Sequence, residues 1–130
     1  MRTSLHHVGV IVPTREQAQE LIAFLRLREQ RVQYVPEYQA QCIFAADASG
    51  RAQIELIVPT GGKLADFNKG MGGLHHLAFQ VDDLHQCAKE LQEEGVQLLE
   101  AKPVDAGPLW INFVPPLFTR GVITEFVQEK

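Results

Sequence analysis

The sequence repeats one set of residues at nearly constant spacing. LHHVGVIV begins at residue 5, and LHHLAFQV begins at residue 74. A second shared stretch closes each half, because IELIV around Glu55 matches TEFVQ around Glu125. The second histidines of the two pairs, His7 and His76, are 69 positions apart (76 − 7), and the two glutamates are 70 apart (125 − 55). Such self-similarity predicts two copies of one structural module.

In the first copy, the hydrophobic pattern predicts a strand, a helix and three further strands. Residues 4–12 form an apolar run that stops at Pro13, which is typical of a strand. A helix is expected over residues 14–27, because Thr14 and Gln17 form a capping box in front of apolar residues at helical spacing. The three further strands are expected at RVQYV, QCIFAAD and AQIELIV, with the turn DASGR between the last two.

The second copy predicts the same order of elements. GLHHLAFQV is expected as a strand, and DDLHQCAKELQEEG as a helix that Asp82 or Asp83 caps and Gly95 ends. The apolar stripe of this helix is expected at Leu84, Ala88 and Leu91. VQLLE, LWINFV and GVITEFVQ are predicted as the closing strands. The glycine-rich stretch between the copies is expected to be a connector that contains a short helix.

These patterns predict an α+β fold in which two tandem βαβββ modules form a cupped, eight-stranded mixed sheet around a metal site. The length of 130 residues suits a single domain of residues 1–130. Module one is expected at about residues 4–60, the connector at about 61–72 and module two at about 73–128.

Composition excludes several classes of partner. A net charge of −4, with acidic and basic residues interspersed, argues against nucleic acid or an anionic membrane as the main partner. No apolar run reaches membrane-spanning length, and the first residues lack the pattern of a signal peptide, so a cytoplasmic protein is expected. Cys42 and Cys87 fit no metal or redox spacing and are expected to be small core residues.

Each copy supplies one histidine from its first strand and one glutamate from its last strand. If the modules pack with pseudo-two-fold symmetry, His7, Glu55, His76 and Glu125 converge on one point of the concave sheet. Two imidazoles and two carboxylates suit Co²⁺, Mn²⁺, Ni²⁺, Fe²⁺ or Zn²⁺, with positions left for water or substrate. An open position is what a Lewis-acid catalyst requires. Any one of the four alone would be interpreted as an ordinary core or surface residue, but their matched spacing predicts a shared site. His85 has no such match and is interpreted as an ordinary surface residue.

Alternation along a strand decides which histidine of each pair is the candidate ligand. Neighbouring side chains point to opposite faces of a strand, so His7 shares a face with Gly9, and His76 shares one with Ala78. These small neighbours leave room for an ion and its ligand. His6 and His75 are expected to face away, with no role assigned to them.

Four segments spread along the chain resemble the vicinal-oxygen-chelate superfamily, and most closely its methylmalonyl-CoA epimerase family. They are LHHVGVIVP, VPEYQAQCIFA, IELIVPTGGKLADFNKGMGGLHHLAFQVDDL and INFVPPLFTRGVITEFVQ. The resemblance implies the same four metal ligands that the repeat predicts. It also implies that Glu37, in VPEYQ, is a catalytic base, and that Glu125, or a water near it, returns a proton to the opposite face of the substrate. A small-molecule substrate of the acyl-CoA type and a homodimer are further implications.

The chain departs from the family pattern near the expected substrate pocket. Pro115 and Leu117 replace the histidine and lysine of an FxHPK segment, and Tyr38-Gln39 replaces a Gln-Gly pair. Trp110 stands where a smaller or polar residue is commoner. These changes leave the ligand set intact and predict a more apolar substrate pocket. Trp110 is expected to pack in the core, to line the cup or to lie at a dimer interface, and Phe113 is expected to pack in the core.

Three functions follow from these features. The first is a metal-dependent epimerase that removes an α-proton from a chelated, methylmalonyl-CoA-like carboxylic thioester. The second is a glyoxalase-like lyase or thiol transferase, although the closing segment lacks the DPDGxxIEL pattern and the first helix lacks FYxxxLG. The third is a non-catalytic small-molecule binding protein, against which the complete ligand set argues.

Overall fold

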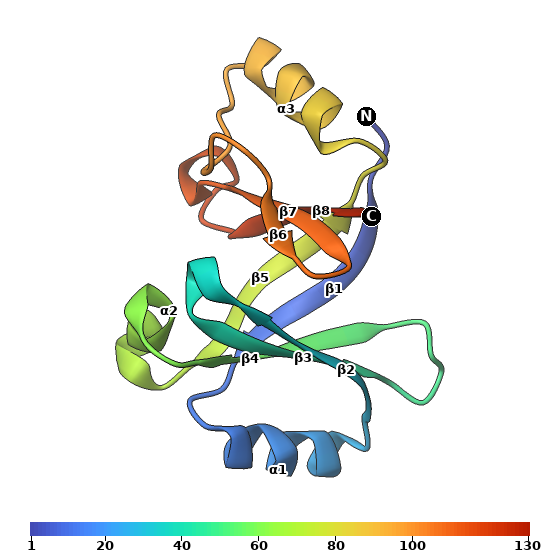
Figure 1. Cartoon of the computed structure of the whole chain (residues 1–130), viewed down its shortest axis with the longest axis vertical. Coiled ribbons are helices and arrows are strands. Elements are labelled where there is room, and N and C mark those ends of the chain that lie inside the picture. The colour runs from blue at the N-terminus through green and yellow to red at the C-terminus, as the bar shows by residue number, and fades with distance from the viewer. The chain divides into compact units, whose positions relative to one another are not determined.

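The computed structural model describes all 130 residues, and the chain divides into two compact units. The N-terminal unit comprises His7–His75, and the C-terminal unit comprises His76–Lys130 together with Met1–His6. Figure 1 shows the helices and strands of both units. No helix has the length and apolar character needed to cross a membrane.

The N-terminal unit has the predicted order of strand, helix and three strands, followed by a short helical connector. Its elements are β1 (Ser4–Ile11, which begins in the other unit), α1 (Arg15–Leu25), β2 (Arg28–Val35), β3 (Ala40–Ala46), β4 (Gln53–Pro59) and α2 (Gly62–Asp66), with the 3₁₀ turns η1 (Pro36–Tyr38) and η2 (Phe67–Gly70). The predicted cap of α1 is confirmed, because Thr14 Oγ1 accepts a hydrogen bond from the Gln17 N–H at 3.1 Å.

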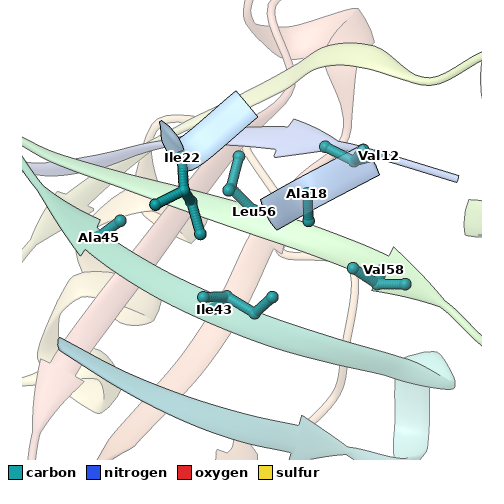
Figure 2. Packing of buried hydrophobic residues seen from close by; sticks show 7 residues of the cluster. All are labelled: Val12, Ala18, Ile22, Ile43, Ala45, Leu56 and Val58. Atoms are coloured by element: carbon teal, nitrogen blue, oxygen red, sulfur yellow. The ribbon is translucent and has the colours of Figure 1, made fainter. Parts of the chain in front are cut away.

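Helix α1 covers one face of the strands in this unit (Figure 1). Its inward residues Ala18 and Ile22 meet side chains from β3 and β4, as Figure 2 shows. All members of this core are nearly or fully buried, namely Val12, Ala18, Ile22, Ile43, Ala45, Leu56 and Val58. Because alternate side chains of β3 and β4 point into this core, the intervening ones are left to form the opposite face.

The C-terminal unit repeats this plan with a shorter edge strand. Its elements are β5 (Gly73–Gln80, which begins in the other unit), α3 (Leu84–Glu93), β6 (Val104–Ala106), β7 (Leu109–Val114) and β8 (Thr124–Glu129), with the 3₁₀ turn η3 (Pro116–Phe118). Asp83 is the cap of α3 and accepts from the N–H groups of His85 and Gln86. The buried stripe of α3 is Leu84, Cys87 and Leu91, so Cys87 takes the central place predicted for Ala88, which is only partly buried.

The predicted strand VQLLE is wrong, because residues 96–100 form no strand. The side chain of Asn112 satisfies the backbone there: its Oδ1 accepts from the Glu100 N–H, and its Nδ2 donates to the Glu100 carbonyl, both at 3.0 Å. Leu98 is buried in the core beneath α3. An apolar pattern without a strand partner therefore became an anchored loop, and the edge strand β6 lies further along the chain.

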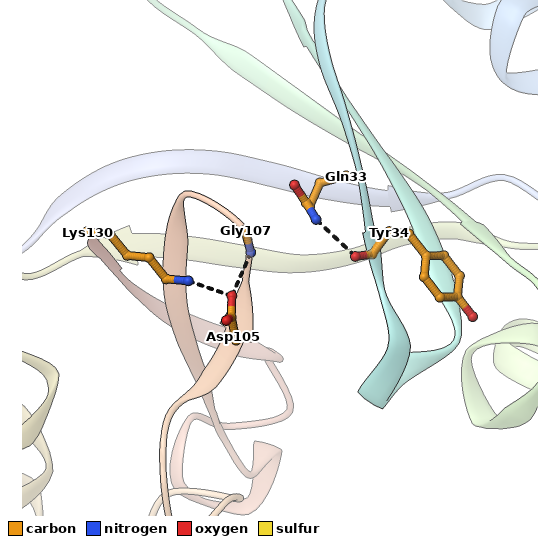
Figure 3. A network of polar contacts seen from close by, with 5 residues as sticks. All are labelled: Gln33, Tyr34, Asp105, Gly107 and Lys130. Carbon is orange, nitrogen blue, oxygen red and sulfur yellow. Dashed lines mark hydrogen bonds and ion pairs between the residues drawn. The ribbon is translucent and has the colours of Figure 1, made fainter.

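Trp110 is partly buried and packs against the core beneath α3. The Nζ atom of Lys130 lies 4.2 Å from the centroid of the Trp110 ring. The same ammonium group donates to Asp105 Oδ1 at 2.5 Å, and the Gly107 N–H donates to that oxygen at 3.0 Å (Figure 3). The Lys130 hydrogen bond is the main reason that the pKa of Asp105 lies below its ordinary value. These contacts tie the end of the chain to the β6–β7 hairpin.

The two units have matching strand pairings. In the N-terminal unit, β1 pairs with β4 in parallel, and β3 pairs with both β2 and β4 antiparallel. In the C-terminal unit, β5 pairs with β8 in parallel, and β7 pairs with both β6 and β8 antiparallel. Within the N-terminal unit the strand order is β2-β3-β4-β1, and within the C-terminal unit it is β5-β8-β7-β6, so each unit has four strands with mixed pairing. The predicted α+β fold of two tandem βαβββ modules is confirmed.

Candidate metal centre

Alternation along β1 and β5 buries the predicted histidine of each pair. His7, Gly9 and Ile11 are buried, whereas the residues between them are less so. His76 and Ala78 are buried in the same manner on β5. Their neighbours His6 and His75 are only partly buried, and the ring of His75 meets the edge of Phe67 with centroids 4.9 Å apart. The choice of His7 and His76 over their neighbours thus agrees with the burial of the strands.

Parallel pairing brings a glutamate to each buried histidine. Glu55 is opposite Gly9 in the β1–β4 pair, and Glu125 is opposite Ala78 in the β5–β8 pair. His7 Nε2 lies 3.4 Å from Glu55 Oε1, and His76 Nε2 lies 3.5 Å from Glu125 Oε1. The structure therefore forms the same His–Glu pair once in each unit, from strands that are far apart in sequence.

All four side chains are removed from water. Their residues are 2%, 7%, 5% and 3% exposed for His7, Glu55, His76 and Glu125 respectively. A buried carboxylate is costly unless hydrogen bonds, an opposite charge or a cation offset its desolvation. Residues kept inside at such a cost are candidates for a functional role.

The donor atoms in each pair fit a divalent cation. Two ligand atoms about 2.1 Å from one ion are about 3.0–3.4 Å apart at octahedral or tetrahedral angles. The His–Glu separations of 3.4 and 3.5 Å are close to that range. Imidazole nitrogen and carboxylate oxygen are the donors favoured by borderline and hard divalent ions, and the pairs contain no thiolate.

An aromatic edge accompanies each pair, which sequence reasoning missed. The rings of Phe44 and His7 are T-shaped with centroids 5.1 Å apart, and those of Phe113 and His76 are T-shaped at 5.5 Å. Phe44 is opposite Glu55 in the β3–β4 pair, and Phe113 is opposite Glu125 in the β7–β8 pair. Phe113 thus lies beside a candidate ligand rather than beneath α3. The signal was available, because the two phenylalanines are 69 positions apart (113 − 44), as the histidines are.

The other candidate residues lie away from these pairs. Glu37 is in η1, between β2 and β3, and its side chain is exposed. His85 is exposed on α3, as expected. Trp110 is partly buried and packs against the core beneath α3, which agrees with the core alternative among its predicted positions.

Comparison with known proteins supplies the family. The family model described as "Glyoxalase/Bleomycin resistance protein/Dioxygenase superfamily" matches residues 6–111. The chain belongs to this superfamily. A mitochondrial methylmalonyl-CoA epimerase of Dictyostelium discoideum is 29% identical over 97% of this chain and 78% of its own. The Bacillus subtilis protein YqjC is 31% identical over 97% of this chain and 92% of its own.

Among solved structures of the superfamily, a methylmalonyl-CoA epimerase from Mycobacterium tuberculosis has a TM-score of 0.89 to this fold, with 27% identity. The match covers 97% of this chain and 87% of that one. The relatives of this superfamily member therefore include epimerases in both sequence and structure, and the two His–Glu pairs stand on the first and last strands of its two modules.

Proposed function

We propose that the chain is a metal-dependent epimerase that inverts the α-carbon of a 2-carboxy thioester of the methylmalonyl-CoA type. The observation that carries the proposal is the repeated, buried His–Glu pair. Support for the reaction class comes from the epimerases among the relatives. The proposed substrate is an acyl-CoA, and the family resemblance adds a homodimer to the proposal. A cytoplasmic location is a separate part of the proposal.

In this proposal the two pairs share one ion, held by His7, Glu55, His76 and Glu125. Co²⁺, Mn²⁺, Ni²⁺, Fe²⁺ and Zn²⁺ all suit a set of two imidazoles and two carboxylates. When bound, such a cation supplies Lewis-acid stabilisation of the negative charge that develops on substrate oxygens as the α-proton leaves. Each histidine also has a T-shaped contact with a phenylalanine ring, which restricts the rotation of its imidazole.

Proton transfer is assigned to two carboxyl groups. The carboxylate of Glu37 takes the α-proton from one face, and the electron pair of that C–H bond moves toward the thioester carbonyl. A proton is then returned to the opposite face from Glu125, or from a water beside it, and the configuration is inverted. For this role Glu37 must become less exposed when the substrate binds, since a base works best when water is excluded from it.

Metal binding tests the ligand set without reference to any substrate. Purified protein is expected to bind about one divalent ion per chain, and His7→Ala and Glu125→Ala are each expected to lose most of that affinity because four ligands act together. His85→Ala is the matched control, since this histidine is exposed on α3. Full retention of the ion in both ligand variants would disprove the ligand set.

Exchange in D₂O tests the reaction. The wild-type protein with methylmalonyl-CoA is expected to exchange the α-proton, as seen by NMR, and Glu37→Gln is expected to slow that exchange by about 10²–10⁴-fold. Glu20→Gln, which changes an exposed glutamate of α1, is the control. Metal binding without exchange of any acyl-CoA would overturn the epimerase and favour the lyase, thiol-transferase or simple binding alternatives.

A further inference from the structure

The C-terminal unit has a cleft between helix α3 and the loop that follows it. The volume of this cleft is about 400 Å³, which lies within the range of about 300–1,000 Å³ that is usual for small-molecule sites. One side is formed by residues of α3, and the other side by residues of the loop between Gly95 and Pro103. No residue of either His–Glu pair lines the cleft.

The bottom of the cleft is apolar and well packed. Leu84 and Leu98, which both line it, are only 1% and 9% exposed and belong to the core beneath α3. Asn112, 3% exposed, also lines it and holds the loop side in place, because its side chain bonds both backbone groups of Glu100 at 3.0 Å. The cleft is therefore formed by the fold itself, before any ligand is present.

The rim of the cleft carries uncharged amide groups. Gln92, from the last turn of α3, and Gln97, from the loop, both line the cleft and are exposed. Neither side chain has a hydrogen-bond partner within the chain, so both amides are available to a ligand. No lysine or arginine lines the cleft, and the one carboxylate there, that of Glu100, repels anions. The lining therefore favours a neutral group over a phosphate or a carboxylate.

These features match the chemistry of an adenine ring. A glutamine amide presents a donor and an acceptor side by side, and the amino group and adjacent ring nitrogen of adenine form the complementary pair on one edge. The flat faces of the ring are suited to contact with apolar side chains such as those of Ala88 and Leu98. A neutral purine would thus satisfy the amide rim and the apolar bottom together.

The cleft and the His–Glu pair of this unit lie on opposite faces of β7. Asn112 and Phe113 are consecutive residues of this strand, so their side chains point to opposite faces. Asn112 lines the cleft, whereas the ring of Phe113 contacts that of His76, with centroids 5.5 Å apart. The sheet therefore separates a ligand in the cleft from the His76–Glu125 pair, and such a ligand leaves that pair accessible.

We propose that this cleft is a second binding site, which takes the adenine ring of a molecule other than the substrate. A free adenine nucleoside or nucleotide has the required chemistry, and its sugar and any phosphate are directed to solvent because no basic side chain lines the cleft. The proposal goes beyond the epimerase and is independent of it, since the two sites share no residue.

Calorimetric titration with adenosine tests the site. The wild-type protein is expected to bind one adenosine per chain, with movement of the backbone amide NMR signals of residues 95–98. Purine riboside, which lacks the amino group, is expected to bind more weakly. Gln92→Met keeps the length of the side chain and removes its amide, so it is expected to weaken adenosine binding about 5- to 100-fold and to leave purine riboside binding nearly unchanged.

Gln86→Met is the matched control, because Gln86 is an exposed glutamine of the same helix that does not line the cleft. Equal adenosine affinity in the two variants would overturn the site, as would a wild type that binds no adenosine at about 10 mM. Equal loss of adenosine and purine riboside binding in Gln92→Met would indicate a structural effect and would also overturn it.

Coenzyme A, which contains an adenine ring, distinguishes the two sources of that ring. Its affinity is expected to be the same in Gln92→Met and Gln86→Met. A loss of coenzyme A affinity that matches the loss for adenosine would overturn the assignment to a separate molecule. Failure of the epimerase would instead appear as an absence of α-proton exchange, which the adenosine titration does not involve.

Discussion

Two glycines with nearly the same backbone conformation provide a sharp test of the connector geometry. Gly72, just before β5, has φ +75°, and Gly50, in the turn between β3 and β4, has φ +73°. A Cβ added to Gly72 would lie 2.3 Å from the backbone oxygen of Ile11, whereas a Cβ added to Gly50 would meet nothing within 4 Å. The two alanine variants therefore share the conformational cost and differ in the steric one.

The magnitudes follow from these contacts. An L-residue in the left-handed region costs about 1–2 kcal/mol, which is the whole effect expected for Gly50→Ala. Gly72→Ala adds a backbone clash of the kind that costs about another 1–3 kcal/mol. The Gly72 carbonyl accepts a hydrogen bond from Asn68 Nδ2 at 2.7 Å, so the segment is held in place and relaxes poorly.

Thermal unfolding followed by circular dichroism measures the difference. The unfolding entropy scales to about 0.27 kcal/mol/K for 130 residues, so each kcal/mol lowers Tm by about 4 °C. Gly50→Ala is expected to lower Tm by about 4–8 °C, and Gly72→Ala by about 8–20 °C. Equal shifts in the two variants would refute the close approach of Gly72 to β1.

Two further predictions concern the C-terminal unit. Asn112→Ala should lower the free energy of unfolding in urea by about 2–3 kcal/mol, because it removes the side chain that bonds both backbone groups of Glu100. Gln97→Ala, in the same loop, is the control and should change that free energy by less than about 0.5 kcal/mol. Equal effects of the two variants would contradict the role of the Asn112 hydrogen bonds. Burial raises the pKa of the Cys87 thiol to about 11 from 9.0, so the folded state holds this proton more tightly than the unfolded state does. The free energy of unfolding of the wild type should therefore fall, relative to that of Cys87→Ala, as the pH rises from 9 to 11. Ellman's reagent at pH 8 should leave Cys87 unmodified until the protein is denatured, and rapid labelling of the native protein would contradict this.

The order of elements and the identity of the two buried His–Glu pairs could be predicted from sequence because both copies of the repeat contain them. Strand alternation then separated His7 from His6, which requires only the period of two in a strand. The loop at residues 96–100 could not be predicted, since its conformation depends on the distant side chain of Asn112.

The surroundings of the His–Glu pairs were less accessible to sequence reasoning. The role of Phe44 and Phe113 depends on strand register, which one-dimensional patterns specify only weakly. The β-bulge between Glu29 and Arg31, which places Arg31 opposite Phe44, carries no glycine or proline signal. The exposure of Glu37 follows from its place in the 3₁₀ turn η1, and the residue type alone does not predict whether a glutamate is buried.

The parallel pairing of the first and last strands of each module has a consequence for the order of folding. His7 and Glu55 are 48 positions apart (55 − 7), and they meet only when β1 docks on β4. The β2–β3–β4 meander joins neighbours in sequence and closes shorter loops, so we expect it to form earlier. The His–Glu pair of the module would then be completed in the last step of its assembly, so the proposed metal ligands come together only after the surrounding strands have formed.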